Sequence, residues 1–241
     1  MNAALDLGNS RLKLLRGDRT KGAWSLASVN WDRFEKLLTP VKRIALCSVN
    51  PVFEPILMEH LGSNREVLDV RHVIAEGKLP FRVIAKGVGA DRVMGVLGAL
   101  RYENPPLIVF NLGTATTATI LDDKQRLIGG YIVPGMELQL SALRNAFPHL
   151  PVPTKLGATT GLGKDTQRAI DAGIPMSVLG LIICTHTAVV EELQNTQVNV
   201  FVTGGHTRLV EKLMKYHGMA QIARTLPELV LEGTLSLLDK Q

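Results

Sequence analysis

Residues 109–123, VFNLGTATTATILDD, have the pattern of two short strands joined by a glycine-containing turn. The residues leading into the turn are continuously apolar, and β-branched residues follow it, as in buried strands. A second stretch, residues 4–15, ALDLGNSRLKLL, has the same plan. In both copies Asp or Asn is followed by Leu, Gly and small polar residues. Two copies of one unusual turn predict that the chain contains a repeated structural unit.

The positions of the two copies predict two lobes. Asp6 and Asn111 are separated by a little under half of the chain, and YENPP at 102–106 resembles a junction. We therefore expect an amino-terminal lobe at 1–104 and a carboxy-terminal lobe at 105–241.

Strand-like and helix-like segments alternate along both predicted lobes, which indicates an α/β fold. The sequence predicts further strands at 42–50, 65–70, 127–134 and 198–205, and helices at 51–62, 91–102, 135–147, 165–173, 176–193 and 207–216.

Composition favours a soluble, cytoplasmic protein. The 241 residues are 46% hydrophobic and 20% charged. No segment is expected to reach membrane-spanning length, and Asp6, Arg11 and Lys13 interrupt the first apolar stretch where a signal peptide would be continuous. The net charge of +5 comes with scattered basic residues and only 5% aromatics, so no nucleic-acid partner is predicted.

The two cysteines, Cys47 and Cys184, both have apolar neighbours in the sequence. We expect two buried, unpaired thiols in a reducing compartment. The six histidines lack the spacing of a zinc site, and no zinc is predicted.

The first turn has the residues of a phosphate site. Gly8 can bring backbone N–H groups close to an anion, and Asp6 can hold a hydrated magnesium ion whose remaining ligands are phosphate oxygens. Asn9, Ser10 and Lys13 complete this interpretation, with Lys13 as the cation. An ordinary β-hairpin explains the same residues when the turn is considered alone. The second copy shifts the balance towards phosphate binding.

A third glycine loop follows a predicted strand at VFVTGGHTRLVEKLM, residues 200–214. Gly204 and Gly205 would let the backbone approach a flat ligand such as adenine beside a helix amino terminus. GATTGLGKDT at 157–166 superficially resembles a Walker A loop. Its glycine spacing is too long, Asp165 stands where a hydroxyl residue is needed, and no strand precedes it.

GVGADRV at 87–93 places Asp91 and Arg92 at the start of a predicted helix. Asp91 could cap that helix, which is worth about 1 kcal/mol. It could instead be a general base for a substrate hydroxyl, with Arg92 stabilising its ionised form. These residues alone leave both interpretations open.

The ordered motifs DLGNSRLK, GADR, GTATT, GGYIVPGMELQLSAL, GKDTQRAIDAGI and TGG resemble those of type III pantothenate kinases, also known as the Bvg accessory factor family. The resemblance extends from Asp6 to Gly205. It implies two ribonuclease-H-like lobes of the actin-like, sugar-kinase ATPase superfamily, and a homodimer. The implied activity is ATP-dependent phosphorylation of pantothenate to 4'-phosphopantothenate in coenzyme A synthesis, with magnesium and a monovalent cation, potassium or ammonium.

The resemblance also implies roles for individual residues. Asp91 would be the catalytic base. The ATP-binding residues would be Asp6, Leu7, Gly8, Asn9, Ser10, Arg11, Leu12, Lys13, Thr114, Gly204 and Gly205, with Asp6 also holding magnesium. The pantothenate site would contain Gly89, Ala90, Asp91, Arg92, Thr166 and Arg82.

Three positions depart from the family pattern. Asn111 and Thr119 stand where Asp is usual, Asn111 at the monovalent-cation position, and Arg82 stands where many members have Tyr. Asn keeps an oxygen ligand without its charge, so weaker or absent potassium activation is expected. The alternatives are a degenerate member acting as a nucleotide-binding regulatory or structural dimer, and a kinase for another small hydroxyl substrate, since Arg82 would favour an acceptor with an additional negative charge.

Overall fold

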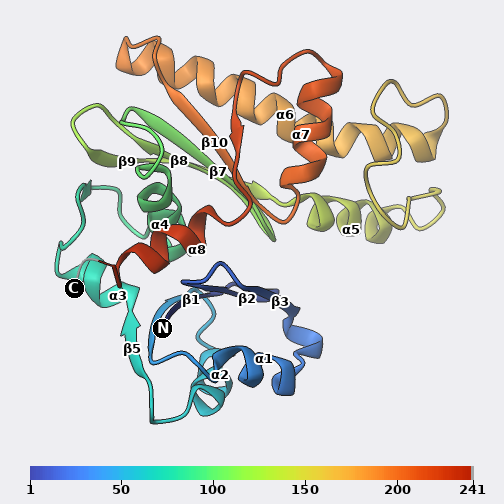
Figure 1. Cartoon of the computed structure of the whole chain (residues 1–241). Coiled ribbons are helices and arrows are strands. Elements are labelled where there is room, and N and C mark those ends of the chain that lie inside the picture. Colours follow the sequence, from blue (N-terminus) through green and yellow to red (C-terminus); the bar gives the residue numbers. More distant parts are fainter. Residues whose placement is uncertain (240–241) are drawn as a thin grey trace. The chain divides into compact units, whose positions relative to one another are not determined.

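The computed structural model describes residues 1–239 (Figure 1). The chain forms two compact units. Unit 1 comprises Met1–Asn104, Asp123–Gly129 and the segment from Glu228 onward, and unit 2 comprises Pro105–Asp122 and Gly130–Pro227. Neither unit is continuous in the sequence, because two later segments return to unit 1. The linear division into lobes at 104 and 105 stays a prediction.

Unit 1 contains a five-stranded sheet of order β3-β2-β1-β4-β5. The strands of this sheet are β1 (Asn2–Leu7), β2 (Arg11–Arg16), β3 (Lys21–Ser25), β4 (Arg43–Ser48) and β5 (Glu66–Asp69). Unit 1 also contains the short β6 (Arg82–Val83), which belongs to the second sheet and pairs with the first residues of β9 (Arg126–Pro134). Its helices are η1 (Leu26–Ser28), α1 (Trp31–Leu38), α2 (Glu54–Leu61), α3 (Val70–Ala75), α4 (Ala90–Ala99) and α8 (Leu229–Ser236).

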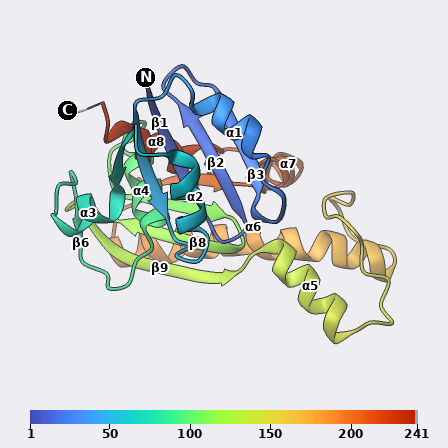
Figure 2. The ribbon, with the colours of Figure 1, turned by 90° about the horizontal axis from the view of Figure 1, so that it is seen from below.

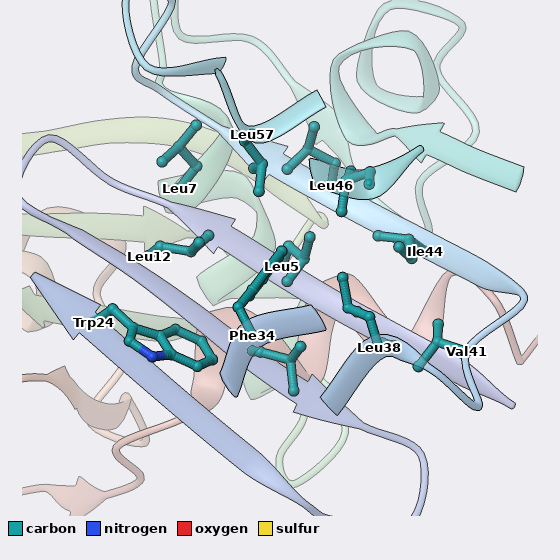
Figure 3. Close-up of a cluster of buried hydrophobic side chains, with 13 residues drawn as sticks. Leu5, Leu7, Leu12, Trp24, Phe34, Leu38, Val41, Ile44, Leu46 and Leu57 are labelled. Carbon is teal, nitrogen blue, oxygen red and sulfur yellow. The ribbon is translucent and has the colours of Figure 1, made fainter. Parts of the chain in front are cut away.

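Side chains alternate along β1, so Leu5 and Leu7 lie on one face of the sheet, the core face, and Ala4 and Asp6 lie on the other, which we call the chemical face. Leu5 and Leu7 point towards α1 and α2, where they pack with Phe34 and Leu57 in the cluster drawn in Figure 3. On the opposite face, Ala4 packs with Leu15 and with Leu231 of α8. Asp6 has the same parity as Ala4, so its carboxylate points away from the apolar cluster.

Helices α4 and α8 pack against each other at very short range. A Cβ on Gly98 would collide with the Leu229 carbonyl, and one on Gly233 would collide with the Met94 carbonyl. Glu232 of α8 is buried and pairs with Arg19 at 2.6 Å, while it accepts a hydrogen bond from the Tyr102 hydroxyl. The helix that begins beside Asp91 is therefore held firmly along its length.

Unit 2 contains the strands β7 (Leu107–Leu112), β8 (Ala115–Leu121), the later part of β9, β10 (Asn199–Gly204) and β11 (Arg224–Thr225). Its helices are α5 (Met136–Ala146), α6 (Thr166–Leu193) and α7 (Thr207–Tyr216), and Figure 2 shows α5 and α6 joined by a long loop. The second sheet has six strands in the order β11-β10-β7-β8-β9-β6. Its run β9-β8-β7-β10-β11 repeats the strand order of the first sheet, with β7 in the place of β1.

The repeat extends to the register of the strands. Asp6 of β1 is paired with Lys13 of β2 and with Cys47 of β4. Asn111 of β7 is paired in the same way with Thr117 of β8 and Thr203 of β10. The strand-turn-strand prediction is confirmed in both copies, as is the α/β class.

Two predictions about α6 were wrong. The expected helices 165–173 and 176–193 are one helix with Pro175 inside, because a proline removes a single backbone hydrogen bond while Ile174 and Val178 stay buried on either side of it. No Asp, Glu, Lys or Arg lies between Asp171 and Glu191, so α6 is long and apolar enough to cross a membrane, contrary to the expectation. Core helices of soluble proteins meet the same criterion, and α6 packs against α5 and α7.

The cysteine prediction was half right. Cys47 is buried on β4, whereas Cys184 is exposed on α6. Apolar neighbours in the sequence did not imply burial for Cys184, because a helix turns adjacent residues to different faces and the buried face carries Ile182 and Thr185.

Candidate active site

Unit 1 carries a row of polar side chains across the chemical face of its sheet. The Lys13 ammonium lies 2.9 Å from the Asp6 carboxylate, with which it is paired across the two strands, and Asp6 is only 5% exposed. Cys47 is the next residue in the row. Burial raises the pKa of its thiol well above the usual value, and the negative charges of Asp6 and Asp91 add to this effect. The buried thiol is therefore neutral.

The predicted phosphate turn joins β1 to β2. The Gly8 N–H donates to the Arg11 carbonyl at 3.0 Å and closes the turn, leaving Asn9 and Ser10 exposed at its tip. Leu7 and Leu12, both predicted to bind ATP, have side chains in the apolar core, so only their backbone can take part. The exposed tip is flanked by a carboxylate and an ammonium group, which are groups able to bind a metal ion and an anion respectively.

Asp91 lies in the first turn of α4 and is not the residue that caps it. The N-cap is Gly89, and a Cβ there would come within 2.7 Å of the Asp91 carboxylate oxygen. Burial raises the pKa of Asp91, and the nearby charge of Asp6 raises it further, against smaller opposing effects from its backbone contacts and Arg92. The charges of the two carboxylates thus interact, and a buried carboxyl group with a raised pKa is a candidate general base.

The neighbours of Asp91 share this partly closed environment. Ala90 is buried at the helix start. Burial lowers the pKa of Arg92, and the charge of Asp91 partly offsets that effect. The GADR motif therefore places a cation and a carboxylate side by side at one helix end.

The second turn, in unit 2, is enclosed by glycine backbone on two sides. The Gly113 N–H donates to the Ala115 carbonyl at 3.1 Å, and the Gly135 N–H donates to the Thr114 carbonyl at 3.0 Å. A Cβ on Gly135 would collide with the carbonyls of Gly113 and Thr114. Gly204, with a φ of +100°, lies so close that its Cβ would be 2.7 Å from the Asn111 side-chain oxygen. Only glycine fits at both positions.

Helix α7 begins beside this second turn. The His206 N–H donates to the Leu112 carbonyl at 3.4 Å, and the Thr207 hydroxyl donates to the Gly204 carbonyl at 2.7 Å. The His206 ring lies 3.4 Å from a Glu137 carboxylate oxygen, which joins the first turn of α5 to the start of α7. The GGHT segment thus presents a helix amino terminus next to Asn111 and Leu112, while Gly205 itself is exposed.

Three other residues singled out in the sequence lie on β6, α6 and β8. Arg82 is exposed on β6, opposite Arg126 in the parallel register, and Thr166 is exposed as the first residue of α6. Thr119 is buried on β8, on the same sheet face as Thr117.

The loop that resembles a Walker A motif does not have the geometry of one. The N–H groups of Gly157 and Thr159 donate to the buried Asp171 carboxylate at 2.6 and 2.5 Å. These amides are therefore directed at a carboxylate of the chain itself, and Asp165 caps α6.

Sequence reasoning missed three residues that shape the turns. Gly135 supports the second turn, His206 starts α7, and Asn50 donates from its side chain to the Gly8 carbonyl at 3.3 Å. Local signals existed for two of them, because Pro-Gly before a helix and Asn-Pro after a strand both mark special turns. The contact between Asn50 and Gly8 joins segments 42 residues apart, and no local sequence pattern predicts it.

The comparison with protein families gives one match. The model of the type III pantothenate kinase family matches residues 3–187. Type III pantothenate kinases from Thermobifida fusca and Agathobacter rectalis are 28% and 27% identical to the chain, with 81% and 87% of the chain and 78% and 88% of the relatives covered. The relative from Fusobacterium nucleatum is 32% identical over 68% of the chain and 66% of its own length.

Solved structures agree at the level of fold. A chain from Campylobacter jejuni named as a conserved Baf family transcriptional activator has a TM-score of 0.62 at 19% identity, covering 99% of this chain and 98% of its own. An archaeal actin homologue, Ta0583, has a TM-score of 0.52 at 9% identity, covering 100% and 99%. A chain from Sinorhizobium meliloti named as a 2-dehydro-3-deoxygalactonokinase has a TM-score of 0.54 at 13% identity, covering 100% and 98%.

These neighbours confirm the predicted actin-like, sugar-kinase fold. The family match covers both turns, the GADR motif and the start of α6. The chain therefore belongs to the type III pantothenate kinase family, which uses ATP to phosphorylate pantothenate in coenzyme A biosynthesis.

Proposed function

We propose that Asp91 is the general base of this pantothenate kinase. The observation that supports the role is the interaction of Asp91 with Asp6, which together with burial raises the pKa of Asp91. A more basic carboxylate accepts a proton more readily. As the pantothenate hydroxyl oxygen bonds to the γ-phosphorus, its proton passes to Asp91 and the bond to the β-phosphate oxygen breaks, releasing ADP.

The ATP phosphates are assigned to the two turns. In unit 1 the exposed tip at Asn9 and Ser10 and the Lys13 ammonium would contact phosphate oxygens, with Arg11 at the edge. In unit 2 Thr114 would contact ATP, and the Gly204-Gly205 backbone would lie against adenosine. Phosphoryl transfer needs mainly positioning and charge neutralisation, and backbone turns with one ammonium supply both.

Magnesium fits the donor set of the first turn. Asp6 is a single carboxylate beside the turn, and residues 1–239 contain no cluster of three or more His, Cys, Asp or Glu side chains suited to a metal. Magnesium keeps several waters and commonly takes one carboxylate plus phosphate oxygens, so one such residue suffices. When bound, the ion would neutralise charge on the transferring group, while Asp6 holds it next to Lys13.

A monovalent cation fits the second turn only through uncharged oxygens. Asn111 offers its side-chain oxygen, and the Thr117 hydroxyl paired with it across β7 and β8 is 8% exposed and has no hydrogen-bond partner within residues 1–239. We assign potassium or ammonium to Asn111, with Thr117 as a neighbouring oxygen. Without a carboxylate the electrostatic attraction for the ion is reduced.

The acceptor site is assigned to the GADR segment. Gly89, Ala90 and Arg92 would surround pantothenate, with Arg82 and Thr166 as outer contacts. A guanidinium such as Arg92 binds a carboxylate well, and pantothenate is a carboxylate.

The exposed face of α6 supports a homodimer. A Cβ on Gly173 or Gly180 would meet nothing within 4 Å, and Met176 and Cys184 are exposed on the same helix. Small residues that no intramolecular contact requires allow close approach of a second helix. We propose that a second copy of the chain packs against this face of α6. We also propose that the protein is cytoplasmic and has no nucleic-acid or membrane partner.

Light scattering should give twice the mass of the chain, and Gly180→Arg should reduce it to one copy. A wild-type monomer at tens of micromolar would contradict the homodimer.

The test of the catalytic assignment is a coupled ADP-release assay with ATP, magnesium and pantothenate, with and without potassium. Turnover that requires pantothenate and falls at least about 100-fold in Asp91→Asn would support the base. Full turnover in Asp91→Asn would refute the role of Asp91. ATP binding without transfer to pantothenate in the wild type would favour a degenerate member or another acceptor.

A further inference from the structure

Asn50 follows β4 at the point where the chain turns towards α2. The Val49 N–H still donates to the Leu7 carbonyl at 3.0 Å, so the pairing of β4 with β1 continues to this point. The Asn50 side-chain oxygen accepts a hydrogen bond from the Phe53 N–H at 3.0 Å, and the Asn50 backbone carbonyl accepts one from the Glu54 N–H at 3.1 Å. One end of the side chain therefore shapes the approach to α2.

The other end of the same side chain holds the first phosphate turn. The Asn50 amide donates to the Gly8 carbonyl at 3.3 Å, across 42 residues of sequence. The Gly8 N–H is already used within the turn by the Arg11 carbonyl. Both polar groups of the Gly8 residue are thus fixed, one by the turn and the other by Asn50.

The residue before Asn50 reaches the catalytic motif. A Cβ placed on Gly89 would lie 3.8 Å from a Val49 methyl carbon and 2.7 Å from an Asp91 carboxylate oxygen, so both side chains approach this glycine. The Val49-Asn50 dipeptide therefore has one side chain hydrogen-bonded to the phosphate turn and the other near the glycine that begins the GADR segment. All of these residues belong to unit 1.

We propose that Asn50 is a positioning residue for phosphoryl transfer, which fixes the first phosphate turn relative to Asp91 through its amide group. It acts on the peptide planes of the turn and not on the reacting atoms. The inference rests on the assignment of the first turn to ATP phosphates. The alternative is a purely structural residue that shapes the start of α2 with its side-chain oxygen alone.

Two substitutions separate these roles. Asn50→Asp keeps the oxygen that accepts from Phe53 and removes the N–H donor to Gly8. Asn50→Ser also keeps an acceptor, reaches less far and adds no charge. Asn30 is the matched control, because its side chain caps α1 by accepting from the Arg33 N–H at 2.9 Å, which is the same kind of bond that Asn50 makes with the Phe53 N–H.

The expected result is a rise in KM for ATP, or a fall in kcat, of roughly 5- to 10-fold in both Asn50 variants, which corresponds to the loss of one hydrogen bond. Their melting temperatures should fall no further than that of Asn30→Ser, whose kinetics stay at wild-type values. An effect in Asn50→Asp alone would show that only the added charge matters and would overturn the proposal. Kinetic changes that merely follow loss of stability, in Asn50 and Asn30 variants alike, would overturn it too.

Asp6→Asn distinguishes failure of this inference from failure of the site assignment. If Asp6→Asn loses turnover while both Asn50 variants keep wild-type kinetics, the phosphate turn stands and the positioning role is wrong. If Asp6→Asn also retains wild-type turnover, the first turn is not the phosphate site and the inference falls with it.

Discussion

Asp6 and Lys13 face each other across β1 and β2 at 2.9 Å, and the residues paired in the same way in unit 2 are Asn111 and Thr117. One fold element thus occurs once with a charged pair and once with a neutral pair. The charged copy lies in the unit that also holds Asp91. The two copies of the turn have the same backbone plan and different chemistry.

Removing the Lys13 charge should therefore affect both function and stability. In Lys13→Met the first turn loses its ammonium, and the nearly buried Asp6 carboxylate loses its ion-pair partner. We expect KM for ATP to rise about 10-fold or more and the melting temperature to fall, since an unpaired buried charge is destabilising. Steady-state kinetics and thermal melts measure these effects. Thr117→Val, at the paired position of the neutral copy, is the comparison and should change stability little. Unchanged ATP kinetics in Lys13→Met would contradict the phosphate role of Lys13.

Asp91→Asn should lose activity and gain stability. The pKa of Asp91 is raised in the folded protein by burial and by Asp6, so its ionised form weakens the fold at any pH above that pKa. The amide keeps the shape and removes the charge. We expect kcat to fall by about 10²- to 10⁴-fold and the melting temperature at pH 8 to rise. A fall in melting temperature at that pH would show that the carboxylate is not destabilised as described.

The same raised pKa sets the acid limb of the pH profile. A carboxyl group whose folded-state pKa is above its ordinary value binds a proton at a higher pH, and the base must be ionised to act. We expect kcat/KM for pantothenate to decline at a higher pH than an ordinary aspartate would give. Burial and the charge of Asp6 both raise this pKa, and Asp6→Asn removes the second cause. The acid limb of the activity that remains in Asp6→Asn should therefore lie at lower pH. If the acid limb of Asp6→Asn stays at the wild-type pH, the charge of Asp6 does not raise the pKa of the group that sets this limb.

The repeated turn, the α/β class and most strands could be predicted, because hydrophobic periodicity and glycine positions are local signals. Helix α1 and helix α8 were not anticipated from the sequence. Helix α8 packs through Gly98 and Gly233, and such a close approach is visible only once both helices are placed. Pro175 led to the opposite error, because the sequence predicted a break between two helices. The residues on both sides of Pro175 are buried, and α6 is continuous.

The sequence could single out candidate site residues by their chemical type, and it could not show the contacts that support the turns. Asp6 and Lys13 flank the first turn and Asp91 lies at the start of α4, and their proposed roles stay predictions. Gly135 and Asn50 support those turns through contacts between segments far apart in the chain, which no periodicity encodes. The roles of Arg82 and Thr166 rest on family resemblance alone, and they stay predictions like the other site assignments.

Gly135→Ala tests the support of the second turn. The added methyl group would collide with the Gly113 and Thr114 carbonyls, both of which are backbone atoms and cannot move aside cheaply. We expect ATP affinity to fall about 10-fold or more and the melting temperature to drop, because overpacking costs about 1–3 kcal/mol. Gly17→Ala is the control, since its Cβ would lie 3.6 Å from the nearest backbone atom. Calorimetry with a non-hydrolysable ATP analogue reports the affinity, and wild-type binding in Gly135→Ala would remove the second turn from the ATP site.

Asn111→Asp should strengthen activation by potassium. The substitution places a carboxylate next to the unpartnered Thr117 hydroxyl and gives the monovalent cation a charged ligand in place of an amide. We expect half-maximal activation at a lower potassium concentration, by about 10-fold, and a larger ratio of activity with potassium to activity with a bulky organic cation. The added charge also sits beside Gly204, whose backbone approaches the Asn111 oxygen, so a lower melting temperature without potassium and recovery with it are expected. That recovery is independent of turnover and reports binding directly. A strong potassium requirement in the wild type, unchanged in Asn111→Asp, would show that the ion is held elsewhere and that the neutral pair in unit 2 has another role.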